Sequence, residues 1–168
     1  MKAIRVNHVS ISAHDVEESA RFYEQVFGLE RIPTYNFAFP VQYLRIGEQQ
    51  LHLFQRGDEA PVNHHVAFDV DDFVGAYERV VELGIHDGAA FFSRIYELPD
   101  GSVQMYIRDP AGNLIELNWP DVNTLDVRAF PSCAASTMTC RKRARRCVRP
   151  STTPASPNRR AERDVTRR

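Results

Sequence analysis

The sequence of 168 residues predicts an α+β fold made of two βαβββ modules. Three observations support this prediction. Residues 7–30 and 64–85 share one pattern, in which a His opens an alternating strand and an amphipathic helix follows. Three further candidate strands follow each helix. The segment 55–63 between the copies is rich in turn-forming residues and too short for a domain linker, so the modules should pack together.

The two copies match element by element. Each contains a His at the start of its first strand, an aspartate before its helix and a Gly that ends the helix: His8, Asp15 and Gly28 in one copy, His65, Asp71 and Gly84 in the other. Asp15 and Glu18 have the spacing of a capping box, and a Gly just past the last apolar position is a common helix stop. The repeat therefore sets the boundaries of both helices.

The remaining strands complete the modules. We expect them near residues 29–33, 41–46 and 50–55 in the first copy, and near residues 91–98, 103–108 and 113–119 in the second. Residues 1–120 would then form one domain, with module one at 1–58 and module two at 62–120. Its mixed sheet should be cupped, with the helices on one face.

Charge divides the chain at about residue 120. Residues 1–120 carry 9 basic and 18 acidic side chains, whereas residues 121–168 carry 12 basic and 4 acidic ones. The second part lacks apolar periodicity and contains all three cysteines, so we expect a disordered basic tail. No aromatic residues interleave with the arginines of the runs CRKRARRC and RPSTTPASPNRR, which does not favour nucleic-acid binding.

No apolar stretch approaches the roughly 18 residues that would cross a bilayer. The N-terminal segment MKAIRVNHVSIS continues directly into an alternating pattern, without the apolar core of a signal peptide. We therefore expect a cytoplasmic protein without a membrane partner.

Side-chain alternation along the strands places four metal-binding side chains on the faces opposite the apolar residues. His8 and His65 open the first strand of each copy, and both lie opposite the valines and other apolar residues of those strands. His52 and Glu116 each stand at the centre of a Leu/Ile-x-Leu triplet in the last strand of a copy. His14, His64 and His86 do not share this arrangement and are not predicted as ligands.

Two equivalent pairs of donors, related by the internal repeat, could converge on one divalent ion. Imidazole and carboxylate donors suit Zn, Fe, Ni, Mn or Co better than Ca or Mg. For any one of these side chains alone, an ordinary half-exposed strand position is the alternative.

The segments that carry this pattern resemble the vicinal oxygen chelate superfamily, which includes glyoxalase I, bleomycin-resistance proteins and extradiol dioxygenases. The resemblance covers residues 4–119 and is most specific in YIRDPAGNLIEL. It implies His8, His65 and Glu116 as metal ligands with His52 as a fourth, a small-molecule substrate and a homodimer. The metal site could form within one chain or across two.

Two departures from family patterns narrow the function. Ser12 and Arg56 stand where bacterial glyoxalase I has an Arg and an Asn, so glutathione recognition is not predicted. Residues 94–101 lack the His that the extradiol dioxygenase signature requires, so ring cleavage is not predicted either.

The sequence thus favours a metal-dependent lyase, isomerase or transferase of the glyoxalase type, in which the ion polarises substrate oxygens. Glu116 is the candidate catalytic base. Four side chains could hold an anionic substrate or could equally be surface or packing residues: Arg45, Arg94, Tyr106 and Arg108. The alternative function is non-catalytic small-molecule or antibiotic binding and resistance, for which an aromatic cleft would serve (Tyr35, Phe37, Phe39 and Tyr43).

Overall fold

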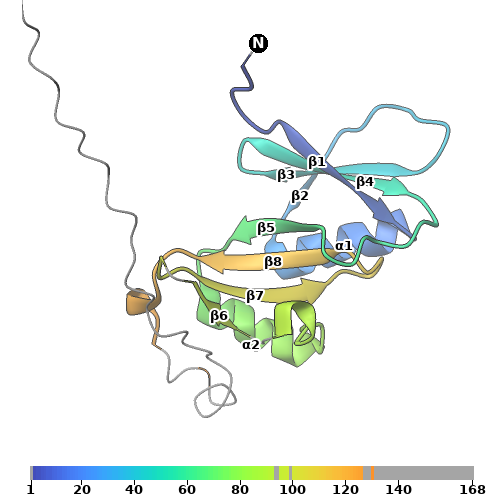
Figure 1. Cartoon of the computed structure of the whole chain (residues 1–168). Coiled ribbons are helices and arrows are strands. Elements are labelled where there is room, and N and C mark those ends of the chain that lie inside the picture. Colours follow the sequence, from blue (N-terminus) through green and yellow to red (C-terminus); the bar gives the residue numbers. More distant parts are fainter. Residues whose placement is uncertain (1, 93–94, 99, 127–129, 131–168) are drawn as a thin grey trace, which may run out of the picture.

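The computed structural model describes residues 2–92, 95–98, 100–126 and 130 (Figure 1). Module one contains β1 (His8–Ala13), α1 (Val16–Phe27), β2 (Glu30–Ile32), β3 (Val41–Ile46) and β4 (Gln49–Gln55). Module two contains β5 (His65–Asp69), α2 (Phe73–Leu83), the 3-10 helix η1 (Ala90–Phe92), β6 (Tyr96–Glu97), β7 (Val103–Arg108) and β8 (Leu114–Trp119). The α+β class and the repeated βαβββ order are confirmed.

Each module forms its own four-stranded mixed sheet. The strand orders are β1-β4-β3-β2 and β5-β8-β7-β6. In both sheets the first strand of the module runs parallel to the last, and the other neighbours are antiparallel. As a result, β1 and β5 are edge strands, and each offers one side to a further strand. No helix in the described part of the chain is long and apolar enough to cross a bilayer.

The helix boundaries follow the predicted caps with one correction. The Asp15 carboxylate accepts a hydrogen bond of 2.9 Å from the backbone N–H of Glu18, as a capping residue should. The equivalent residue in module two is Asp72, not Asp71, because α2 begins at the buried Phe73 and the Asp72 carboxylate accepts from the N–H of Gly75.

The strand predicted at 91–98 is reduced to the two residues of β6. The cause is a turn just before it, in which the Asp87 carboxylate accepts hydrogen bonds from the N–H groups of Ala89 and Ala90. A 3-10 turn follows, in which Phe91 has a positive φ of 50°. Side-chain acceptors of this kind compete with strand pairing.

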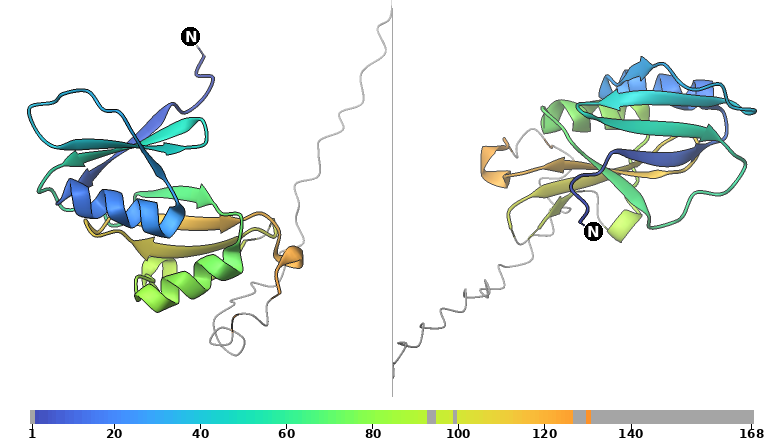
Figure 2. Two further views of the ribbon diagram at one scale, coloured as in Figure 1. Left: turned by 180° about the vertical axis from the view of Figure 1, so that it is seen from behind. Right: turned by 90° about the horizontal axis from the view of Figure 1, so that it is seen from above.

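One hydrophobic core joins the two modules. It includes Leu51 and Leu53 from the first sheet and Ile115 and Leu117 from the second, all essentially inaccessible to solvent. Side chains of α1 and α2 line one cavity together with Phe68 of β5 and Leu117 of β8, so both helices lie against the core-facing side of the second sheet (Figure 2). Helix α1 contacts β3 and β4 of its own module, while Phe27 packs edge-on against Phe68 of β5.

A buried hydrogen-bond network around Asp109 fastens module two to module one. The Asp109 carboxylate accepts from the hydroxyl of Tyr23 on α1 at 2.8 Å and from the side-chain amide of Asn113 at 2.8 Å. It also accepts from the backbone N–H groups of Ala111 and Asn113. The same amide nitrogen of Asn113 donates to the backbone carbonyl of Ser12 at the end of β1. Burial raises the pKa of Asp109, and these hydrogen bonds oppose the rise.

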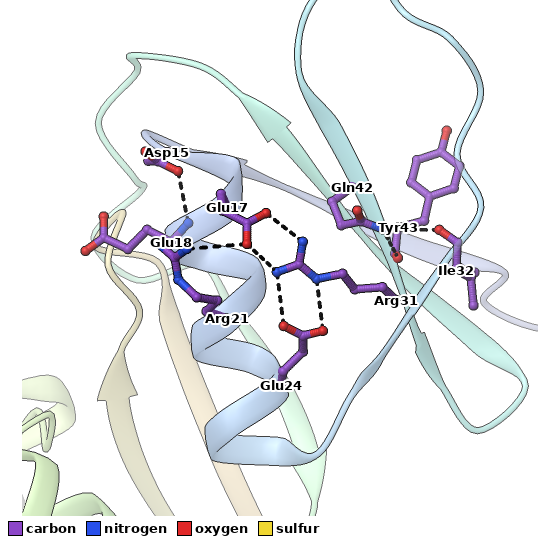
Figure 3. A network of polar contacts seen from close by, with 9 residues as sticks. All are labelled: Asp15, Glu17, Glu18, Arg21, Glu24, Arg31, Ile32, Gln42 and Tyr43. Atoms are coloured by element: carbon purple, nitrogen blue, oxygen red, sulfur yellow. Dashed lines mark hydrogen bonds and ion pairs between the residues drawn. The ribbon is translucent and has the colours of Figure 1, made fainter.

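A second polar cluster attaches β2 to α1 (Figure 3). The Arg31 guanidinium donates to Glu17 at 2.6 Å and to Glu24 at 2.9 Å, so one side chain spans two turns of the helix. These hydrogen bonds lower the pKa of Glu17. Because β2 leads into the segment 33–40, Arg31 fixes the point at which that segment leaves the module.

The described fold continues past the predicted boundary at residue 120. A 3-10 helix η2 (Val122–Thr124) follows β8, and Val122 and Leu125 pack against the core. Phe130 is 2% exposed and lies edge-on against Phe73 and Tyr77 of α2. At least these residues of the predicted tail therefore belong to the folded domain. Residues 127–129 and 131–168, with Cys133, Cys140 and Cys147, lie outside the described residues.

Replacing Asp109 with Ala should lower the free energy of unfolding by about 3 kcal/mol, because several buried donors lose their acceptor. Tyr23→Phe removes one donor only and should cost about 2 kcal/mol. Urea denaturation followed by circular dichroism measures both, with the exposed Asp71→Ala as control. An Asp109→Ala variant as stable as the control would show that the network does not hold the modules together.

Phe130→Ala should lower the free energy of unfolding by about 3 kcal/mol, since it empties a buried aromatic site. Val81→Ala, on the exposed side of the helix α2 against which Phe130 packs, should change the free energy of unfolding by less than about 0.5 kcal/mol. Equal melting temperatures of the two variants would place residue 130 outside the folded domain.

Candidate functional site

The four predicted ligands lie in two pairs. His8 on β1 and His52 on β4 form the first half-site, and His65 on β5 and Glu116 on β8 form the second. In each pair the edge strand supplies the first residue and its parallel neighbour supplies the other. The repeat therefore places the pairs at equivalent positions of the two sheets.

The first half-site is a stack of three rings. His52 lies between Tyr43 and His8, with ring centroids 3.6 Å and 4.2 Å away and nearly parallel planes. Burial, followed by repulsion from His8, lowers the pKa of His52. Its imidazole is therefore neutral near pH 7, which is the state that a metal ligand requires. Its Nε2 donates to the side-chain oxygen of Gln50 at 2.8 Å.

The second half-site is held by hydrogen bonds around a carboxylate. Glu116 is 5% exposed and accepts from the hydroxyl of Tyr106 at 2.7 Å and from the side-chain amide of Gln104. His65 Nε2 lies 3.1 Å from Glu116 Oε2. A buried carboxylate needs such partners, and here they fix its orientation toward His65.

His8 and His65 both place their Nδ1 atom next to an oxygen. His8 Nδ1 lies 2.9 Å from the side-chain oxygen of Asn7, and His65 Nδ1 lies 3.1 Å from the backbone carbonyl of Asn63. In His8 this contact leaves Nε2 available for a metal, whereas Nε2 of His65 lies 3.1 Å from the Glu116 carboxylate. Metal-binding histidines commonly have this arrangement, with one nitrogen on the metal and the other donating to an oxygen.

A tyrosine flanks the inner residue of each half-site. Tyr43 stands directly across the sheet from His52, and Tyr106 stands directly across from Glu116. Both tyrosines are candidates from the sequence, but the sequence does not predict that they occupy equivalent positions in the two sheets. In VQYLRI and VQMYIR they occupy the third and fourth positions, which alternation would assign to opposite faces. Only the strand register shows that they correspond.

The two half-sites do not come together within one chain. Residues adjacent to His52 and Glu116 point into the shared core, so these two side chains project from the opposite faces of their sheets. Among the described residues, no group of three or more His, Cys, Asp or Glu could hold a metal ion. The four-ligand set stays a prediction, and one chain alone does not assemble it.

Two of the candidate substrate-binding side chains have structural partners. Arg108 donates to the Asp87 carboxylate at 2.7 Å and to the carbonyl of Gly112 at 2.9 Å. Burial alone would raise the pKa of Asp87, but its hydrogen bonds, with Arg108 foremost, keep it lowered. Arg45 pairs with Glu30. Tyr106 lies in the second half-site, and Arg94 lies outside the described residues.

Comparison with known proteins gives the relationship of the whole domain. Residues 5–117 match the family model described as the Glyoxalase/Bleomycin resistance protein/Dioxygenase superfamily. The chain belongs to this superfamily. The Bacillus subtilis (strain 168) protein YwbC is 30% identical to it over 125 residues, which cover 68% of this chain and 96% of YwbC.

Solved structures that are similar to this chain carry different descriptions. A lactoylglutathione lyase from Agrobacterium tumefaciens is 27% identical, with a TM-score of 0.55 over 70% of this chain and 95% of the lyase. A fosfomycin resistance protein from Listeria monocytogenes has a TM-score of 0.59 over 73% and 95% of the two chains. At 16% identity, the second likeness shows the fold alone. The resemblance predicted from the sequence is confirmed.

Tyr106→Phe should lower the free energy of unfolding by about 1.5 kcal/mol, because the buried Glu116 carboxylate loses the hydrogen bond that the Tyr106 hydroxyl donates. Tyr35→Phe, on a side chain that is 79% exposed, should leave stability unchanged. Chemical denaturation compares the two variants. Equal stability would mean that the Tyr106 hydroxyl does not hold Glu116.

Proposed function

We propose that this protein is a divalent-metal-dependent lyase, isomerase or transferase of the glyoxalase type, acting in the cytoplasm on a small oxygen-bearing substrate. The observations that support it most strongly are that Nδ1 of both His8 and His65 lies beside an oxygen, and that Nε2 of His65 lies 3.1 Å from the Glu116 carboxylate. Three imidazoles and one carboxylate suit Zn, Fe, Ni, Mn or Co.

The metal site would be completed by a second copy of the chain. The half-sites lie at the edge strands β1 and β5, each of which has one side open to pairing. A two-fold dimer that sets β1 of one copy beside β5 of the other would join His8 and His52 to His65 and Glu116 of the second copy. Two equivalent sites would result, each within a cupped sheet of two modules.

A bound metal would supply Lewis-acid polarisation of the substrate oxygens. Glu116 is the residue of this chain that can take up a substrate proton, since its carboxylate has no Lys or Arg partner among the described residues. Tyr106 and Gln104 are positioning residues that hold this carboxylate in place. His65, next to the carboxylate, keeps it from facing bulk solvent.

The alternative is a binding and resistance protein without catalysis. The exposed aromatic side chains around His52 favour it, because a binding protein needs an apolar surface but no metal. Metal dependence separates the two functions.

Wild-type protein purified without chelator should contain a divalent metal and melt at a higher temperature as Zn²⁺ is added. His8→Ala and Glu116→Ala should each lose both properties, whereas His14→Ala should keep them. Elemental analysis and thermal melts measure the outcome. A wild type that neither contains nor responds to metal contradicts the proposal and leaves the binding function.

Mixing the two defective variants tests whether two chains share the site. In a heterodimer of His8→Ala and Glu116→Ala chains, one site carries both changes and the other carries none. Refolding an equal mixture should restore about a quarter of the wild-type zinc content. No recovery in a purified heterodimer would place the site within one chain.

A further inference from the structure

Exposed aromatic side chains gather beside the two half-sites. In the part of the chain that the structure describes, the exposed ones are Tyr35, Phe37, Phe39 and Phe91. The first three lie in the segment 33–40 and contact rings next to His52, while Phe91 contacts His65 and Tyr106 with ring centroids 5.9 Å and 4.9 Å away. Aromatic surface exposed only at a polar site suggests a ligand that covers it.

On module one these rings form a continuous surface, which we call the aromatic wall: Tyr35, Phe37, Phe39, Tyr43 and Phe54. Phe54 lies 5.9 Å from Phe37 and 6.0 Å from Phe39, measured between ring centroids. Tyr43 carries the contacts on to His52. Phe54 is two residues after His52 on β4, so both side chains lie on the same face of the sheet. The wall is thus an extension of the first half-site.

The segment that carries the wall is anchored at both ends. The Gln42 side chain donates to the backbone carbonyl of Ile32 at 3.1 Å, which joins the end of β2 to the start of β3 (Figure 3). The N–H of Gln55 donates to the carbonyl of Pro40 at 3.0 Å. Together with the Arg31 cluster on α1, these contacts hold the rings toward the ligand-bearing face.

A cation stands at the far end of the wall. The Arg56 guanidinium lies 5.7 Å from the centre of the Phe39 ring and makes no ion pair with any described residue. It borders a cavity of about 300 Å³ together with Ser10, Ile11, Ser12 and Phe54. Arg56 is one of the two residues that depart from the glyoxalase I pattern, so a feature that argues against glutathione provides a site for a different anion.

We propose that the aromatic wall binds a planar aromatic anion of about two rings, with its anionic group at Arg56 and its other end at the first half-site. The four residues from His52 to Arg56 span roughly 13 Å of strand, which is an upper limit on the length of such a ligand. As a statement about substrate class, this inference rests on the proposed function. The chemistry it assigns is stacking on the rings combined with charge pairing at Arg56.

The probes are 2-naphthoate, its neutral amide 2-naphthamide, and Zn²⁺. Titrations followed by naphthalene fluorescence anisotropy, with and without Zn²⁺, give the dissociation constants. A Phe37→Ala/Phe39→Ala variant should bind both compounds about tenfold more weakly, because the stacking surface is lost. Arg56→Gln should weaken 2-naphthoate about tenfold and leave 2-naphthamide unchanged, because only the charge pair is lost.

Matched controls lie on other surfaces. Leu83→Ala removes an exposed apolar side chain of α2, and Arg21→Gln removes an exposed cation of α1, so both should bind like the wild type. Thermal melts confirm that each variant folds. The inference is overturned if neither compound shows saturable binding, or if the Phe and Arg56 variants bind like the controls.

Further outcomes distinguish this inference from a subunit interface and from the proposed metal-dependent function. Sedimentation shows whether Phe37→Ala/Phe39→Ala turns a dimer into a monomer, which would make the wall a subunit interface and overturn the inference. Zn²⁺ binding without 2-naphthoate binding contradicts the inference of an aromatic anion and leaves the proposed metal-dependent function standing. Naphthoate binding with the expected variant pattern but no response to Zn²⁺ supports the wall and contradicts the metal-dependent function.

Discussion

Asp109 joins the two modules through a carboxylate that is almost wholly removed from water. Its oxygens meet the Tyr23 hydroxyl from α1 and the Asn113 amide, which in turn reaches the end of β1. A buried carboxylate is tolerated only where donors surround it, so the network forms only when α1, β1 and the β7–β8 turn are all in place. This constraint fixes how module one sits against module two.

The orientation that follows decides where chemistry can occur. Since both sheets turn their apolar faces to the common core, His52 and Glu116 lie on the faces opposite it, and the four donors do not meet in one chain. The same packing that stabilises one chain therefore leaves each half-site incomplete. Edge strands with an open side lie at both half-sites, and a second copy can satisfy backbone and ligand requirements together. Assembly and metal binding would then be one event.

Periodicity and repetition predict the parts of this structure that depend on neighbouring residues. They place His8, His52 and Glu116 on the faces opposite the core, because a period of two leaves no other choice. They do not predict features that depend on hydrogen bonds or packing formed by particular side chains in the folded structure. The Asp87 turn shortens the predicted strand at 91–98, and Phe130 returns from beyond a polar segment to pack on α2. The relative placement of the modules depends on Tyr23 and Asp109, whose separation of 86 residues carries no local signal.

The two half-sites hold their candidate metal ligands in place by different interactions. Burial among rings lowers the pKa of His52, whereas the Glu116 carboxylate is held in place by the donors that surround it. Joined around a divalent ion, three neutral imidazoles and one carboxylate leave an excess positive charge at the site. Such a centre attracts anionic oxygen, and Arg56 extends that preference along the aromatic wall.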